Sequence, residues 1–339
     1  MKKQYRSLLW FGAGAAALMA FRAVTKKLNA YSFKNKVVVI TGGARGMGLA
    51  VARIFAEEGA KLAICSRTEH QLKTAAEELT AMGAEVLALP CDLTNRIKAE
   101  GFIQKVKAHF GQIDVLINNA GVIQTGPLEN MTLQDFDNAM KIHFWAPLYT
   151  MLSVIPEMKA RGEGRIVNIA SVGGKVSVPH IVPYSASKFA LVGLSSGFRH
   201  EMKKYGIKVT TINPGLTRTG SNFNISVKGQ AEKEFALFTA MGSSLLTSSS
   251  AENTARQIVE ACRNGEAEVL TNFPARFLAL SNELMPELTS DILSLTTQYL
   301  LPAPSDSNVG KTGFESDSQL VPEHLHNRAM GAALKNNEF

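Results

Sequence analysis

A strand, a glycine-rich turn and a helix follow one another near the start of this chain, and this unit constrains the fold more than any other feature. Residues 36–40, Lys-Val-Val-Val-Ile, predict a buried strand because they are β-branched and do not alternate with polar residues. The turn at 41–48 reads T-G-G-A-R-G-M-G, and residues 49–58 have the apolar spacing of a helix. Glycines let the backbone approach a pyrophosphate, and a helix N-terminus offers amide donors and a positive dipole. The unit therefore predicts a dinucleotide-binding fold.

Strands and helices continue to alternate after this unit. Further strands are predicted at residues 59–65, 85–89, 113–117, 165–170, 208–212 and 268–271, and helices at 70–82, 95–110, 133–160, 184–205 and 251–263. This order is typical of an α/β fold with a Rossmann-like, doubly wound parallel sheet. Ligands bind beyond the carboxyl ends of such strands. Gly42, Asn118, Ser171 and Pro214 all follow predicted strand ends, so we expect them to meet at one site.

The domain organisation follows from shifts in composition. Residues 1–34 form an apolar segment flanked by basic residues, and 35–272 form a single catalytic domain. Residues 273–301 form an amphipathic helical appendage, which either packs on the protein or contacts a membrane or lipid substrate. Within the catalytic domain, 220–250 is either a mobile lid over the substrate or an ordinary packed loop. Residues 302–339 are polar, and we expect an extended or disordered tail.

The N-terminal segment predicts a membrane anchor. Residues 8–21 are uncharged, and counting through Arg22 to Val24 brings the segment close to the roughly 20 residues of a spanning helix. A cleaved signal peptide and a buried amphipathic arm are the alternatives. The expected location is a membrane, contacted through residues 8–24, with the catalytic domain in the cytoplasm, where its cofactor is held.

The net charge of +7 does not indicate nucleic-acid binding. The first 36 residues carry eight of the 36 basic residues and no acidic residue, which leaves 28 basic against 29 acidic side chains in the rest. The basic residues therefore flank one apolar segment and form no body-wide patch. Cys65, Cys91 and Cys262 are far apart with no C-x-x-C motif, so we expect small core residues and no metal site.

The end of the second strand bears on the choice of cofactor. Enzymes that prefer NAD place an acidic residue here to bind the adenosine ribose, whereas this chain has Ser66 and Arg67. Arg45 lies within the glycine turn, and two converging arginines suit a 2′-phosphate. NADP(H) is therefore the expected cofactor; the alternative is that both arginines are solvated surface residues. Asp92, after the third strand, either accepts a hydrogen bond from adenine or caps the next helix.

Tyr184 and Lys188 are the candidates for proton transfer. Residues four apart share one face of a helix, so the phenol and the ammonium can point into the same cleft. A nearby ammonium lowers the pKa of a phenol from about 10, and the tyrosine can then exchange a proton with a substrate oxygen. Ser171, thirteen residues upstream, could hold the same oxygen.

Taken together, these motifs resemble the short-chain dehydrogenase/reductase family, in order and spacing, over residues 35–271. The resemblance implies that Tyr184 is the acid or base, that Lys188 lowers its pKa and holds the nicotinamide ribose, and that Ser171 orients the substrate carbonyl. It also implies an adenosine side lined by Asn118, Ala120 and Gly121, and a contact between Thr219 and the nicotinamide carboxamide. The expected cofactor-binding residues are Thr41, Gly42, Arg45, Gly46, Met47, Gly48, Ser66, Arg67, Asp92, Asn118, Ala120, Gly121, Tyr184, Lys188, Pro214, Gly215, Thr217 and Thr219.

One position departs from the family pattern. The family usually has an asparagine on the helix beneath the site, where this chain has His143. In the family this residue supports a proton path largely through its backbone carbonyl, a role that the change would preserve. His143 is therefore a fourth catalytic candidate, either as a titrating relay or through its backbone; the alternative is a packed histidine with no proton role.

The sequence thus predicts an enzyme that transfers a hydride between NADPH and a ketone or secondary alcohol. The anchor and the apolar lid favour a lipophilic substrate. The alternative function is a membrane-tethered NADP(H)-binding sensor or scaffold that has lost catalysis, and the altered His143 is its only support. The resemblance further implies a homodimer or homotetramer formed through the helices that carry His143 and Tyr184.

Overall fold

The computed structural model describes residues 31–339, and they form a doubly wound α/β fold around one seven-stranded sheet. The strand order is β11-β7-β6-β4-β1-β2-β3, and every pair in the sheet is parallel. The strands are β1 (Val37–Thr41), β2 (Lys61–Ser66), β3 (Val86–Pro90), β4 (Val115–Asn118), β6 (Gly164–Ile169), β7 (Ile207–Asn213) and β11 (Glu268–Leu270). The predicted fold class is confirmed. The chain changes direction between β1 and β4, and ligands bind outside such a switch point.

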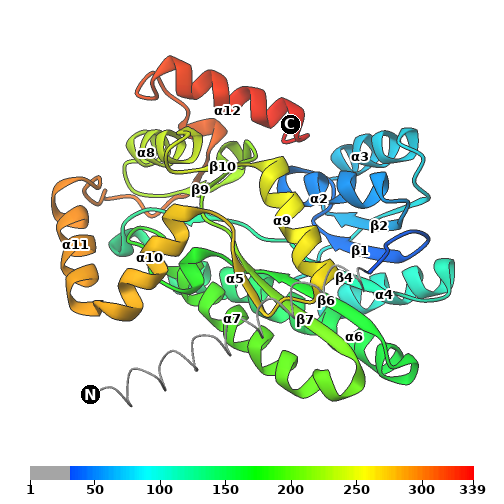
Figure 1. Ribbon diagram of the computed structural model, residues 1–339. Coiled ribbons are helices and arrows are strands. Elements are labelled where there is room, and N and C mark those ends of the chain that lie inside the picture. Colours follow the sequence, from blue (N-terminus) through cyan, green and yellow to red (C-terminus); the bar gives the residue numbers. More distant parts are fainter. Residues whose placement is uncertain (1–30) are drawn as a thin grey trace, which may run out of the picture. The chain divides into compact units, whose positions relative to one another are not determined.

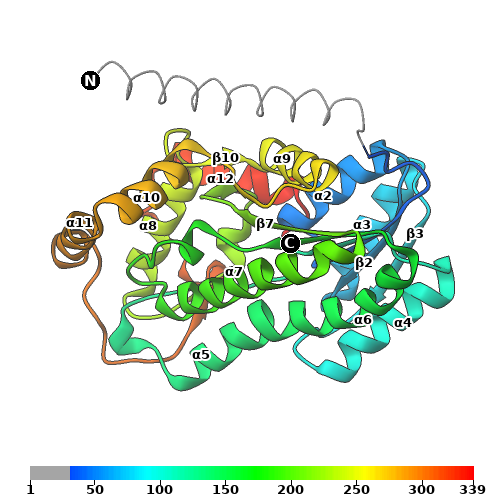
Figure 2. The ribbon, with the colours of Figure 1, turned by 60° about the horizontal axis from the view of Figure 1, so that its bottom comes forward.

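Helices cover both faces of the sheet (Figures 1 and 2). One face carries α2 (Gly46–Glu57), α3 (Glu69–Ala81) and α9 (Ala251–Asn264); the other carries α4 (Arg96–Phe110), α5 (Leu133–Met140), α6 (Ala146–Arg161) and α7 (Val182–Met202). Because both faces are covered, the strands need no polar alternation, and all five residues of β1 are buried. On the second face, Phe102 of α4 and Met151 of α6 pack against strand residues such as Leu116.

The predicted helix over 133–160 is interrupted where His143 lies. A π-helical turn, Lys141–Trp145, joins α5 to α6 without a loop. A π-turn inserts one extra residue into the helical ladder, and such turns are frequent at functional sites. The insertion determines where the His143 side chain lies relative to α7, which packs on this turn.

Smaller elements at one end of the sheet form the region expected to cover the substrate. The short strands β8 (Thr217–Arg218) and β10 (Ser249–Ser250) pair there, and α8 (Ala231–Ser243) lies between them in the chain. The predicted appendage consists of two helices, α10 (Phe273–Leu284) and α11 (Pro286–Tyr299). Pro286 lacks an amide hydrogen and starts the second helix, which explains the break.

The structure differs from the sequence prediction over residues 302–339, which are folded onto the body. Strand β12 (Lys311–Thr312) pairs with β9 (Ser226–Val227), and β9 pairs with β5 (Gln124–Thr125). Helix α12 (Glu323–Lys335) packs against α8, with Ala329 and Ala333 in a buried cluster around Phe223 and Phe235. The buried face of α12 consists of alanines, so it gives almost no hydrophobic signal in a polar stretch.

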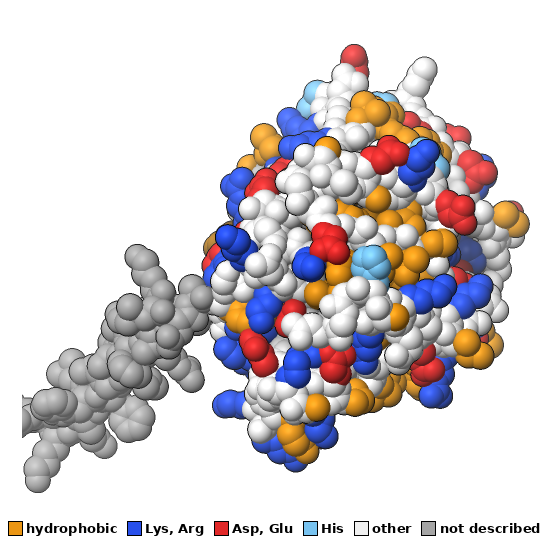
Figure 3. Space-filling model, turned by 90° about the vertical axis from the view of Figure 1, so that its right-hand side faces the viewer, with side chains coloured by type: hydrophobic (Ala, Val, Ile, Leu, Met, Phe, Trp, Pro, Cys, Tyr) orange, Lys and Arg blue, Asp and Glu red, His pale blue; other side chains and the backbone are white. Residues whose placement is uncertain are grey.

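The predicted anchor, residues 8–24, lies outside the described residues. Within residues 31–339, no helix combines the length and apolar character needed to cross a membrane. The three cysteines are free and buried. On the face drawn in Figure 3, basic and acidic side chains are interspersed and do not gather into one basic patch.

Candidate active site

One large cavity opens at the carboxyl ends of β1, β4, β6 and β7, with a volume of about 1060 Å³. It brings together every site residue predicted from the sequence except Thr41, Gly48 and Asn118. The predicted residues that line it are Gly42, Arg45, Gly46, Met47, Ser66, Arg67, Asp92, Ala120, Gly121, His143, Ser171, Tyr184, Lys188, Pro214, Gly215, Thr217 and Thr219.

The glycine turn at the start of α2 depends on backbone shapes that only glycine adopts freely. Gly42 and Gly46 have φ of 63° and 56°. A Cβ on Gly48 would lie 2.1 Å from the carbonyl oxygen of Gly42, so any side chain here would push the turn open. Helix α2 has no side-chain N-cap and no acidic residue in its first turn. Its N-terminus is therefore suited to an anion supplied from elsewhere, as the phosphates of a dinucleotide would be.

Thr41 and Asn119 hold the glycine turn against the end of β4. The Thr41 hydroxyl accepts hydrogen bonds from the backbone amides of Asn119 (3.0 Å) and Ala120 (3.1 Å). The Asn119 side chain donates to the carbonyls of Thr41 (3.0 Å) and Gly42 (3.1 Å). Asn118 was predicted from the sequence and Asn119 was not, although the two form a polar pair directly after a buried strand.

Asn118 lies behind the site and does not line it. Its amide donates to Asn168 Oδ1 on β6 (2.8 Å), and its carbonyl accepts from the Thr150 hydroxyl on α6 (2.7 Å). All three side chains are buried. Asn118 therefore joins β4, β6 and α6, and so fixes where the two strand ends meet.

Arg45, Arg67 and Asp92, which are expected near the adenosine, differ in their exposure and in their hydrogen-bond partners. Arg45 forms an ion pair with Glu338, whereas Arg67 is exposed. Asp92 accepts hydrogen bonds from the amide and hydroxyl of Thr94. It does not cap α4, because the Asn95 side chain accepts from the Lys98 amide and takes that position. The helix-cap alternative for Asp92 is therefore excluded.

Ser171, Tyr184 and Lys188 meet at the junction between β6 and α7. Ser171 is the second residue after β6, and its hydroxyl accepts a hydrogen bond from the Gly173 amide (3.0 Å). The Lys188 ammonium donates to the carbonyl of Ile169 (2.8 Å) and lies 5.6 Å from the centre of the Tyr184 ring. Tyr184 and Lys188 therefore lie close together in the cavity, as expected of two residues on one face of a helix.

The electrostatics of this pair differ from the sequence expectation. Burial raises the pKa of Tyr184, and a hydrogen bond with Ser171 opposes that rise only in part. Burial lowers the pKa of Lys188 to about 7. The lysine therefore does not depress the phenol below its usual range, because desolvation is the larger effect on both groups. Tyr184 is protonated at neutral pH, which suits it to donate a proton.

His143 is enclosed in a hydrogen-bonded chain beneath Tyr184. Its Nε2 accepts from the Val122 amide (3.2 Å), which places the proton on Nδ1, and Nδ1 donates to the Ser187 hydroxyl (2.8 Å). That hydroxyl donates to the carbonyl of Tyr184 (2.7 Å). Burial and then the charge of Lys188 hold the pKa of His143 well below its usual value. The imidazole is therefore neutral, with one tautomer fixed by its partners.

The stretch after β7 forms another wall of the cavity. The Pro214 carbonyl accepts from the Val172 amide (2.9 Å), which holds this wall beside Ser171. A Cβ on Gly215 would lie 2.4 Å from Asn272 Oδ1, so the close approach of α10 requires glycine. The Thr217 hydroxyl donates to the Gly215 carbonyl (3.1 Å), and the Thr219 hydroxyl donates to Ser221 Oγ (2.9 Å).

Two further groups in the cavity were not predicted. His180 Nδ1 lies 2.7 Å from Glu234 Oε1, and both side chains are buried although the chain separates them by 54 residues. His180 has φ of 62°, which is unusual for a residue other than glycine. Glu338, three residues after α12, also lines the cavity. The tertiary packing of α8 and α12 brings these residues to the site. No local sequence pattern therefore predicts them.

The doubly wound sheet, the glycine turn at a helix N-terminus and the serine, tyrosine and lysine on one cavity define the class of nucleotide-dependent oxidoreductases of the Rossmann type. The model of the short chain dehydrogenase family matches residues 36–228. The chain belongs to this family.

Its relatives are oxidoreductases. An uncharacterized oxidoreductase from Thermotoga maritima is 36% identical over 56% of this chain and 74% of its own length. An 11-beta-hydroxysteroid dehydrogenase-like protein from Arabidopsis thaliana is 33% identical over 82% of this chain and 87% of its own. The structure of L-sorbose reductase from Gluconobacter frateurii with NADPH and L-sorbose is similar, with a TM-score of 0.64, 26% identity, and coverage of 72% of this chain and 98% of that chain.

Proposed function

We propose that this protein transfers a hydride between NADP(H) and a ketone or secondary alcohol, with Tyr184 as the acid or base. The observation that carries the proposal is one cavity that contains Ser171, Tyr184 and Lys188 together with the glycine turn. The nicotinamide cofactor supplies or accepts the hydride. A phenol whose pKa is raised by burial holds its proton at neutral pH, which favours carbonyl reduction as the direction in which Tyr184 begins as the acid.

The roles of the three residues follow from where charge develops. As the carbonyl oxygen becomes an oxyanion, the hydroxyls of Ser171 and Tyr184 donate to it, and their contribution grows with the charge. Lys188, whose pKa is about 7, carries a partial positive charge beside the phenol and stabilises the phenolate that remains after proton transfer. His143, through Ser187, holds the backbone of Tyr184 in place, so we assign it a positioning role.

The cofactor assignment rests on the residues that would hold its phosphates. The N-terminus of α2 lacks a side-chain cap, and Arg45 stands at its N-cap position. Arg45 and Arg67 line the same cavity, and no carboxylate follows β2 directly in the chain. The similar L-sorbose reductase was solved with NADPH. These observations favour NADP(H) over NAD(H) for this chain.

The substrate is proposed to be lipophilic. Val178, Ile181, Leu237, Phe238 and Met241 are apolar residues that line the cavity. The buried His180–Glu234 pair also lines it, and it would select a substrate with a matching polar group.

Replacement of Tyr184 by phenylalanine tests the reaction. Tyr184→Phe removes the proton donor and leaves the ring, so we expect NADPH-dependent reduction of a carbonyl panel to fall by about 1000-fold or more. NADPH binding should change less than about three-fold, which fluorescence titration measures. Substantial remaining turnover would refute the assignment. Tight NADPH binding by the wild-type protein with no turnover of any carbonyl would favour the alternative function of a sensor or scaffold.

Oligomer formation stays a prediction. Leu133, Trp145, Leu152 and Phe189 are exposed on the helices and the turn near His143 and Tyr184, and burial of these side chains would favour a dimer or tetramer through this face. Sedimentation equilibrium of the full chain checks it, and a monomer at micromolar concentration would contradict it.

A further inference from the structure

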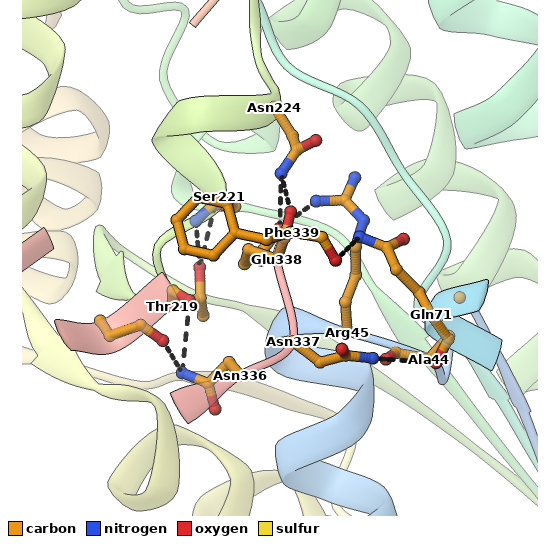
Figure 4. A network of polar contacts seen from close by, with 12 residues as sticks. Ala44, Arg45, Gln71, Thr219, Ser221, Asn224, Asn336, Asn337, Glu338 and Phe339 are labelled. Atoms are coloured by element: carbon orange, nitrogen blue, oxygen red, sulfur yellow. Dashed lines mark hydrogen bonds and ion pairs between the residues drawn. The ribbon is translucent and has the colours of Figure 1, made fainter. Parts of the chain in front are cut away.

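The last four residues of the sequence, Asn336–Phe339, lie against the glycine turn of the cofactor site (Figure 4). The carbonyl of Asn336 accepts a hydrogen bond from the Gly46 amide at the start of α2 (2.8 Å). The side-chain amide of Asn337 donates to the carbonyls of Ala44 and Gln71, each at 2.8 Å. The segment therefore bonds to the turn that was predicted to receive a phosphate.

Glu338 places a buried carboxylate at this anion site. The residue is 2% exposed and forms an ion pair with Arg45, and its Oε2 also accepts from the side-chain amide of Asn224 (2.9 Å). Its Oε1 is buried without a hydrogen-bond partner among the described residues. This oxygen lies 2.6 Å from the position that a Cβ on Gly46 would take, so it is directed at the first residue of α2.

Packing of the neighbouring residues keeps the segment in this position. The Phe339 ring centre lies 5.1 Å from that of Phe314 and 5.9 Å from that of Phe223. Before the segment, a Cβ on Gly220 would lie 2.2 Å from the Cα of Ala333, so α12 approaches the body closely. Glu338 is thus delivered to the site by a folded element.

A buried carboxylate is costly unless its surroundings favour a negative charge. Burial raises the pKa of Glu338, and Arg45 and Asn224 act against that rise. The uncapped N-terminus of α2 and the guanidinium of Arg45 are the groups that would receive a phosphate. One such set of donors cannot hold the carboxylate and a phosphate of the cofactor at the same time.

We propose that Glu338 is an internal competitor for the phosphate-binding part of the cofactor site. Cofactor binding displaces the segment Asn336–Phe339, and the free energy of that displacement weakens the affinity for the cofactor. The inference rests on the proposed function, because it concerns the same cofactor site. The competing anion is either the 2′-phosphate, found only in NADP(H), or the pyrophosphate, found in both cofactors.

Replacement of Glu338 by glutamine in the full chain tests the competition. Glu338→Gln removes the charge and nearly preserves the shape, so we expect the Kd for NADPH, measured by calorimetric titration, to fall by about ten-fold. The Kd for NADH should fall equally if the pyrophosphate competes, and remain unchanged if the 2′-phosphate competes. Glu323→Gln is the matched control, because Glu323 is exposed in the first turn of α12, and it should leave both values unchanged.

Hydrogen exchange of the wild-type protein provides a second measurement. The amides of Asn336 and Glu338 donate to carbonyls of Ala332 and Ala333, so displacement by saturating NADPH should speed their exchange. An unchanged or higher Kd in Glu338→Gln, or slower exchange when NADPH binds, would overturn the inference and leave the hydride-transfer proposal intact. If the wild-type protein and Glu338→Gln are both folded and neither binds NADPH or NADH, the inference and the hydride-transfer proposal would both be overturned.

Discussion

At the scale of residues, the site is built from buried polar groups whose burial has an energetic cost. Lys188 is 4% exposed, and a single backbone carbonyl is the hydrogen-bond acceptor identified for it among the described residues. His143 is likewise buried and Tyr184 is partly buried, and both remain neutral at pH 7. Such groups reduce the stability of the fold, and we propose that they are retained for chemistry.

Lys188→Met should therefore stabilise the fold. Burial lowers the pKa of Lys188 to about 7 from 10.5, whereas the unfolded chain keeps the higher value. Between pH 7 and 10.5 the unfolded state binds more protons, so wild-type stability rises with pH in that window. Methionine removes the cost of the buried charge, and we expect the free energy of unfolding to rise by on the order of 1–3 kcal/mol at pH 6.

Urea unfolding of the ligand-free protein at pH 6 and pH 9 measures this effect, and the gain should be smaller at pH 9. Lys105→Met is the control, because Lys105 is exposed on α4 and should show little change. A loss of stability at pH 6 would contradict the account.

At the scale of elements, the strand ends and the glycine turn determine the site, and both could be predicted from the sequence. The run of β-branched residues before Thr41 and the spacing of Gly42, Gly46 and Gly48 specify a strand, a tight turn and a helix N-terminus. The interruption at Lys141–Trp145 could not be predicted in this way, because a π-turn changes the helical ladder without changing the apolar pattern.

Gly48→Ala tests the dependence of the site on the turn. The added Cβ would lie 2.1 Å from the Gly42 carbonyl oxygen, so the turn must open. We expect the Kd for NADPH, measured by titration, to rise by about 100-fold or more. The circular dichroism spectrum should show that the fold is retained. The matched control is Gly101→Ala on α4, where no neighbouring atom lies within 4 Å of the added Cβ. That change should stabilise the protein by about 0.5–1 kcal/mol. An unchanged Kd in Gly48→Ala would contradict the role of the turn.

At the scale of the whole molecule, segments far apart in the sequence complete the cavity. His180 meets Glu234, and Arg45 meets Glu338, across separations of 54 and 293 residues. These pairs could not be predicted from the sequence, because the pairing depends on how α8 and α12 pack. The prediction of a disordered tail failed for the same reason, since Ala329 and Ala333 are too small to give a clear apolar pattern.

Membrane association is the whole-molecule property that the sequence predicts and that we propose for this chain. It rests on the apolar segment 8–24 and on exposed apolar side chains of α10 and α11, among them Phe273, Phe277, Leu284 and Ile292. Ala16→Lys combined with Leu18→Lys places two charges in the segment, which a bilayer disfavours by a few kcal/mol each. We expect the wild-type chain to remain in carbonate-washed membranes and the double variant to enter the soluble fraction. A wild-type chain in the soluble fraction would contradict the proposal.

The most direct test of the central claim is the transfer of deuterium from NADPH labelled at C4 of the nicotinamide to a carbonyl substrate, followed by mass spectrometry of the product. Both C4 faces should be labelled in turn, because hydride leaves from one face. With one of the two labelled cofactors, the wild-type protein should give an alcohol that carries one deuterium on its carbinol carbon. Tyr184→Phe should give no labelled alcohol. NADPH binding with no deuterium in any product, across sterol, retinoid, keto-lipid and xenobiotic carbonyls, would contradict hydride transfer to a carbonyl as the function.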